Sequence, residues 1–110
     1  MIIIFANKKL REFANDNNHA IRKMGSKRAE LYLRRIDDLA NAGSFAELEH
    51  LPGRFHPLTQ NRKGQWACDL DHPYRLIFEP REVPSSFDIF DKIGWNKIKC
   101  VVIIEITDYH

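Results

Sequence analysis

Hydrophobic residues recur along this chain with two different spacings, and the change between them divides the sequence in half. Between residues 7 and 50 they recur every three or four positions, which places them on one face of an α-helix. From residue 54 onward apolar and polar residues alternate, as they do in β-strands that bury one face. The pattern therefore predicts helices first and a sheet afterwards.

The first half is expected to contain one strand and two long helices. The β-branched run at residues 1–6 predicts the strand, and Asn7 is a suitable N-cap for the helix after it. Gly25 should end this first helix, and Ser26 can cap the second. The apolar stripe of the second helix continues until Gly43. The two helices are expected to form a hairpin.

The second half is expected to form a sheet after one short helical turn. Ser44 and Glu47 have the spacing of a capping box, which predicts that turn. If Leu76 and Phe78 face the helices, Arg75 must point to the opposite face, because side chains alternate along a strand. The alternating segments predict antiparallel strands over residues 54–59, 65–70, 74–79 and 97–107.

These elements predict an α+β fold, in which an N-terminal strand and a two-helix hairpin pack on one face of a twisted antiparallel sheet. Residues 81–96, between the last two strands, are expected to form an exposed excursion. A chain of 110 residues is close to the commonest domain size, so we expect a single domain over residues 1–110.

Composition argues against several classes of protein. Hydrophobic residues make up 44% of the chain and charged residues 29%, which is typical of globular proteins and not of disordered ones. Every apolar run is far shorter than the roughly 20 residues that span a bilayer, and the apolar start lacks the basic region of a signal peptide. We therefore expect a cytoplasmic protein that has no membrane partner.

Net charge and cysteine content exclude few classes of function. The net charge of +2 is too small to indicate a nucleic-acid partner on its own. Cys68 and Cys100 match neither a zinc spacing nor a disulfide framework, so we expect buried thiols and neither a metal nor a cofactor. Trp66 and Trp95 are expected to pack in the core or against a loop rather than to stack on bases.

A chemically specific set of side chains should collect on the face of the sheet that the helices leave open. RNA cleavage without a metal needs a base for the 2′-hydroxyl, an acid for the departing 5′-oxygen and fixed cations for the charge on phosphorus. Histidine can serve either proton role near neutral pH, and the planar guanidinium of Arg75 suits a phosphate better than a lysine does. The candidates are Arg54, His56, Arg62, Lys63, Arg75, Asp108, Tyr109 and His110.

Each of these polar residues also has a plainer interpretation. Arg75 could form a surface ion pair with Asp69 or Glu79, which would contribute little to stability. Arg28 and Arg35 share one flank of the second helix, and a solvated flank is the simpler explanation for them. Three further histidines are expected to be ordinary surface or core residues: His19, His50 and His72.

Three segments of the second half occur together in one known family. Residues 54–70, 74–80 and 108–110 contain the elements H-x-L, R-K-G-x-W, Y-R-x-x-F and D-Y-H. In this order and spacing they resemble the RelE/ParE toxin superfamily, and specifically its HigB-like "killer protein" branch, which serves plasmid maintenance in type II toxin–antitoxin systems. The resemblance covers most of the chain and implies the compact fold of that superfamily.

The resemblance also implies an activity and partners. It implies a ribosome-dependent endoribonuclease that cuts messenger RNA in the ribosomal A site. A HigA-type helix-turn-helix antitoxin is implied to restrain it, and the toxin is implied to contact operator DNA only through that antitoxin. The implied catalytic residues are His110 or Asp108 as general base, His56 as proton donor or phosphate contact, Arg75 as transition-state clamp and Tyr109 as positioning or stacking residue.

One position departs from the family pattern, and two other functions stay open. HigB-like proteins commonly have Lys where this chain has Thr59, so Arg62 or Lys63 is expected to supply the cation from the loop, with Arg54 as a further phosphate contact. The open alternatives are a ParE-like inhibitor of DNA gyrase and a degenerate module that binds only the antitoxin. His56 and the terminal triplet favour the nuclease.

Overall fold

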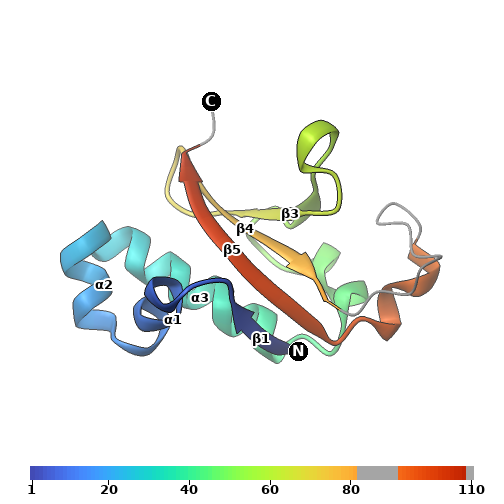
Figure 1. Ribbon diagram of the computed structural model, residues 1–110, viewed down its shortest axis with the longest axis horizontal. Coiled ribbons are helices and arrows are strands. Elements are labelled where there is room, and N and C mark those ends of the chain that lie inside the picture. Colours follow the sequence, from blue (N-terminus) through green and yellow to red (C-terminus); the bar gives the residue numbers. More distant parts are fainter. Residues whose placement is uncertain (82–91, 109–110) are drawn as a thin grey trace.

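A mixed β-sheet forms the centre of the computed structural model, which describes residues 1–81 and 92–108 (Figure 1). Within these residues the strands lie in the order β1-β5-β4-β3-β2. All neighbouring strands are antiparallel except β1 and β5, which run parallel. The strands are β1 (Ile2–Phe5), β2 (His56–Pro57), β3 (Trp66–Asp69), β4 (Tyr74–Pro80) and β5 (Cys100–Asp108).

The α+β fold class is confirmed, with one change to the sheet. We expected the N-terminal strand to pack on an antiparallel sheet, whereas β1 joins the sheet as an edge strand parallel to β5. The physical reason is that the backbone N–H and C=O groups of the strand need hydrogen-bond partners, and the edge of β5 supplies them. The helices between β1 and β2 then cover one face of the sheet (Figure 1).

The described residues form three α-helices, because the first predicted helix is divided in two. Asp16 has an extended backbone, and its carboxylate accepts a hydrogen bond from the N–H of His19 at 3.0 Å, so it caps a new helix. Asn7 caps the preceding helix as expected, accepting from the N–H of Leu10 at 2.9 Å. Gly25 ends the second helix with a φ of +88°. The helices are α1 (Lys8–Asn15), α2 (Asn17–Met24) and α3 (Ser26–Asn41).

Three short 3₁₀ helices complete the described elements. The capping box is confirmed, since the Glu47 carboxylate accepts from the N–H of Ser44 at 3.1 Å. In the described part of the chain, no helix has the length and apolar character that a membrane crossing requires. The 3₁₀ helices are η1 (Phe45–His50), η2 (Gln60–Arg62) and η3 (Lys92–Lys97).

The main core lies between α3 and the sheet. Leu76 and Phe78 are fully buried in it, so they face the helices as predicted. Trp66 and Trp95 are also core residues, with their rings edge to face at 5.0 Å, which confirms packing roles for both. Cys68 is a buried free thiol, and burial raises its pKa well above the ordinary value, so it stays protonated at neutral pH.

A β-bulge changes which side chains of β5 face the core. Ile103 and Glu105 pair with consecutive residues of β4, so Ile104 between them is an extra residue. Before the bulge, Val101 and Ile103 are fully buried against the helices, and after it Ile106 packs against the same core. The uninterrupted alternation that we expected along this strand is therefore wrong, because the extra residue reverses its phase.

Two arginines of α3 hold the β3–β4 hairpin against the helix layer. Arg35 is buried and donates from Nε to the carbonyl oxygen of Asp69 at 2.8 Å. Arg28 donates to the Asp71 carboxylate at 2.9 Å, and its guanidinium lies 3.4 Å from the centre of the Tyr74 ring. The expectation of a solvated helix flank is wrong, since both side chains reach the hairpin.

Replacing Gly53 tests how closely the backbone before β2 approaches Arg35. Gly53 has a φ of +111°, and a Cβ there would lie 2.6 Å from Cζ of Arg35. We expect Gly53→Ala to lower the free energy of unfolding by about 3 kcal/mol, because backbone strain and the displacement of Arg35 add together.

Gly64 supplies the matched control, since its φ is +97° and a Cβ there would meet nothing within 4 Å. Gly64→Ala should therefore cost about 1 kcal/mol, from backbone strain alone. Urea unfolding followed by circular dichroism measures both variants. Equal losses would show that the approach to Arg35 does not constrain the backbone.

Candidate functional site

Charged side chains from β2, from the turn before it, from β3 and from β4 lie on the face of the sheet opposite to the helices. Arg54 Nη1 lies 3.6 Å from one carboxylate oxygen of Asp69, and Arg75 Nε lies 3.8 Å from the other. His56 Nδ1 lies 2.6 Å from the carbonyl oxygen of Arg54. We call His56, Arg54, Asp69 and Arg75 the charged cluster: the two arginine side chains face the Asp69 carboxylate, and His56 contacts the main chain of Arg54.

The contact of His56 decides which ring nitrogen can take part in chemistry. A carbonyl oxygen can only accept, so Nδ1 must carry the proton in this contact. Nε2 is then an acceptor in the neutral ring and a donor in the protonated ring. His56 is partly exposed on a strand at the edge of the sheet, so a ligand can approach that nitrogen.

The balance of charge in the cluster favours an anion. Within the cluster, two guanidinium groups face the single carboxylate of Asp69. Both distances exceed ordinary hydrogen-bond lengths, so the contacts are ion pairs that a competing anion could replace. The ion pair that we considered between Arg75 and Asp69 is thus present, but Asp69 also faces Arg54.

A small pocket of about 150 Å³ lies beside the charged cluster, where β3 turns into β4. Sequence reasoning missed two polar residues of this pocket, His72 and Tyr74. We expected His72 to be an ordinary surface or core histidine, although its position in a tight turn between Asp69 and Arg75 could have indicated that it lines this pocket. The pocket is lined by Arg54, Asp69, Leu70, His72, Pro73, Tyr74 and Arg75.

The middle of this sheet face is covered rather than open. Leu58 folds over Ala67 and Ile77, and the three form a second, small apolar cluster, with Ile104 partly buried against it. We expected the whole face to be available to solvent or ligand, and that expectation is wrong for its centre.

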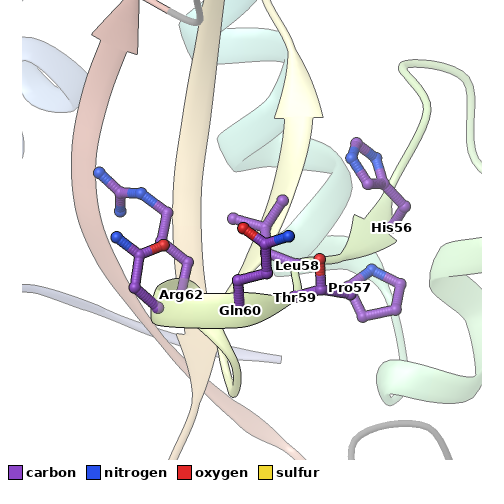
Figure 2. A pocket seen from close by; sticks show the side chains of 7 residues that line it. His56, Pro57, Leu58, Thr59, Gln60 and Arg62 are labelled. Atoms are coloured by element: carbon purple, nitrogen blue, oxygen red, sulfur yellow. The ribbon is translucent and has the colours of Figure 1, made fainter.

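A second cavity, of about 390 Å³, runs along the segment from His56 to Arg62 (Figure 2). Figure 2 shows His56 at one end of this segment and Arg62 at the other end, and in this view Arg62 lies over β4 and β5. Arg62 donates to the side chains of Gln65, at 2.9 Å, and Glu105. Arg62 therefore holds the turn to the sheet, whereas Lys63 and Thr59 are exposed.

The last strand brings a further predicted residue to the charged end of the sheet. Asp108 is exposed at the end of β5, opposite Tyr74, and Thr107 is opposite Arg75. Tyr109 and His110 lie outside the described residues. The structure thus describes six of the predicted site residues: Arg54, His56, Arg62, Lys63, Arg75 and Asp108.

Strand spacing limits how His56 and Arg75 can act together. They stand two strands apart and are offset by two residues along the strands, so their Cα atoms are separated by roughly 12 Å. The two side chains can therefore reach one ligand from different sides without contacting each other. Among the described residues, no three His, Cys, Asp or Glu side chains lie together as a metal site.

Comparison with solved structures identifies the architecture. The chain is similar to the "YoeB/ParE toxin from Agrobacterium tumefaciens", with a TM-score of 0.58, 11% sequence identity and full coverage of both chains. No family model and no curated protein matches the sequence. The predicted RelE/ParE-like fold is confirmed, whereas the HigB-like branch stays a prediction because likeness at this identity shows the fold alone.

Asp69 should limit how tightly the charged cluster holds a polyanion. We expect Asp69→Asn to raise the affinity for a labelled single-stranded oligoribonucleotide about 3- to 10-fold at low salt, because Arg54 and Arg75 lose their competing carboxylate. The gain should shrink as salt rises. Fluorescence anisotropy measures both.

Asp71→Asn is the matched control, since that carboxylate pairs with Arg28 on the helix side. It should leave the affinity unchanged apart from the loss of one negative charge at long range. A weaker affinity in Asp69→Asn would mean that Asp69 positions the two guanidinium groups more than it competes for them.

Proposed function

We propose that this chain is the toxin of a type II toxin–antitoxin pair and a ribosome-dependent endoribonuclease that cleaves messenger RNA. The observation that carries the proposal is the charged cluster of His56, Arg54, Asp69 and Arg75 on the helix-free face of a RelE/ParE-like fold. An imidazole and two guanidinium groups are the residue types that phosphodiester cleavage by 2′-hydroxyl attack requires.

Arg75 is proposed as the clamp for the charge that develops on phosphorus. Its side chain is 20% exposed, so the guanidinium is held in place but still open to a ligand. A preorganised cation of this kind stabilises a phosphorane more than the ground state, because it needs no reorganisation when charge develops. Arg54 and Lys63, both exposed, are proposed as further contacts to the RNA backbone.

Proton transfer is assigned to groups on the two sides of Arg75. His56 is proposed to protonate the departing 5′-oxygen through Nε2, since Nδ1 is engaged with the Arg54 carbonyl. Asp108 or His110 is proposed as the base that takes the 2′-hydroxyl proton. Tyr109 is proposed to position or stack on a base.

Partners follow from the same proposal. A HigA-type helix-turn-helix antitoxin is proposed to hold the toxin inactive and to make the only link to operator DNA. The ribosome is proposed to present the message in its A site. Arg62 is engaged with Glu105, so Lys63 is the better candidate for the cation that Thr59 does not supply.

Expression in a bacterium tests the activity. We expect the wild-type chain to arrest growth and to leave messages truncated within codons, and Arg75→Ala to lower the cleavage rate about 100-fold or more. Arg34→Ala is the matched control, because Arg34 is an exposed arginine paired with Glu30 on the helix side. It should remain toxic.

The other two functions predict different results in the same cells. A gyrase inhibitor would cause DNA damage and altered supercoiling with intact messages, and the effect would survive His56→Ala. A degenerate module would leave growth unchanged while still binding an antitoxin. Either outcome would overturn the nuclease proposal.

The pH dependence of cleavage separates the acid from the base. With intact ribosomes, the wild-type rate should follow a bell, and His56→Ala should lose the limb that reports the acid, with a fall of about 10²- to 10⁴-fold in rate. His110→Ala should lose the opposite limb if His110 is the base. An unchanged bell in His110→Ala would assign the base to Asp108 instead.

A further inference from the structure

His56, the proposed proton donor, lies on the shortest strand among the described residues. β2 comprises two residues, His56 and Pro57, and it pairs with β3 at the edge of the sheet. Pro57 has no N–H, so it can donate no backbone hydrogen bond to hold the strand. The position of His56 therefore depends on how the chain is anchored on either side of it.

Buried side chains anchor this strand before and after His56. Phe55 is buried in the main core, and its ring centre lies 6.0 Å from that of Phe78. Leu58 is buried on the opposite face of the sheet, in the small apolar cluster. The anchor on the helix side is thus part of the main core, whereas the anchor on the helix-free side is a single leucine and the segment that it begins.

This segment crosses the helix-free face of the sheet, and we call residues 58–64 the strap (Figure 2). Gln60 in the strap has a φ of +57°, a left-handed backbone that side chains other than glycine rarely adopt. A strained backbone of this kind persists only where the surrounding contacts hold it. The contact that joins the strap to the far side of the sheet is the ion pair of Arg62 with Glu105 of β5.

The β-bulge of β5 gives the strap two adjacent anchor points. Consecutive side chains of a regular strand point to opposite faces of the sheet. At the bulge, Ile104 packs against the cluster that contains Leu58, and Glu105 beside it accepts from Arg62. The extra residue therefore provides an apolar and an ionic anchor for the same strap.

The strap lies next to the charged cluster on this face. Ala67 and Ile77, against which the strap packs, are opposite each other, and Asp69 and Arg75 form the next pair on the same side of these two strands. Two residues along a strand span roughly 7 Å. A phosphodiester held by Arg75 therefore comes close to the strap as well as to His56.

We propose that Glu105 is a positioning residue for the proposed cleavage. Paired with Arg62, it holds the strap in place, and the strap in turn fixes His56 relative to Arg75. Glu105 acts through Arg62 and contacts neither the RNA nor the reacting atoms. This inference rests on the proposed function, in which His56 donates a proton and Arg75 binds the phosphate.

Single-turnover cleavage on ribosomes, at saturating toxin, separates positioning from binding. Glu105→Gln removes the ion pair and keeps the shape of the side chain. We expect the rate constant at saturation to fall about 10- to 100-fold, because a displacement of about 1 Å has an effect of this size. The affinity for the ribosome should stay equal or rise up to about 3-fold, since the guanidinium of Arg62 is released. Partial unfolding would instead lower the amplitude and leave the rate constant unchanged.

The matched control is Glu30→Gln, which removes an equal charge from an exposed carboxylate paired with Arg34 on the helix side. It should change neither constant. Arg62→Ala should lower the rate constant as much as Glu105→Gln, and the double variant should be no slower than either, because the two residues act as a unit. The exchanged pair, Arg62→Glu with Glu105→Arg, should recover most of the lost rate.

Hydrogen exchange tests the anchor without any activity. The N–H of Leu58 donates to the carbonyl oxygen of Gln65 at 2.9 Å, and that of Lys63 to the carbonyl oxygen of Gln60 at 3.1 Å. Both amides should exchange about 10-fold faster in Glu105→Gln, while the amides of β4 should be unaffected, because only the strap is released. Equal exchange in the variant and the wild type would overturn the inference.

Failure of this inference can be distinguished from failure of the proposed function. If the wild-type chain cleaves messages and Glu105→Gln cleaves them at the same rate, the nuclease stands and the positioning role is wrong. A loss of affinity in Arg62→Ala that accounts for its whole loss of cleavage would also overturn the inference, because Arg62 would then be an RNA contact. If the wild-type chain cleaves no message, the proposed function fails and the positioning role fails with it.

Discussion

The pairing of β4 with β5 is the constraint on which the rest of the structure depends. β5 binds β1 along its first half and β4 along its whole length, so the two ends of the chain and the hairpin are joined through one strand. The register of this pair places Thr107 beside Arg75, and the bulge at Ile104 keeps apolar residues facing the helices on both sides of it. The core and the charged end of the sheet are thus set by one ladder of hydrogen bonds.

Asp69 links the helix layer to the charged cluster. Its carbonyl oxygen accepts a hydrogen bond from the buried Arg35 on one face, while its carboxylate faces Arg54 and Arg75 on the other. One residue thus connects the helix layer with the two guanidinium groups. Gly53 permits this arrangement, since any side chain there would displace Arg35.

The fold is compatible with more than one activity, so the argument for a nuclease depends on particular side chains. β2 supplies His56, the turn before β2 supplies Arg54, and the end of β5 supplies Asp108.

The local patterns of the sequence determined the caps at Asn7 and Ser44, the end of α2 at Gly25 and the face on which Arg75 lies, because each depends on residues within a few positions. The cap expected at Ser26 is absent, and α3 ends at Asn41 before Gly43. Only the tertiary structure decided that β1 is parallel to β5, that Arg35 reaches Asp69 and that His72 joins the pocket beside Arg75. Such contacts join residues far apart in the sequence, and many partners of equal charge or polarity compete for each of them. Periodicity predicts the face of an element on which a side chain lies, whereas the packing of the whole chain determines which residues that side chain contacts.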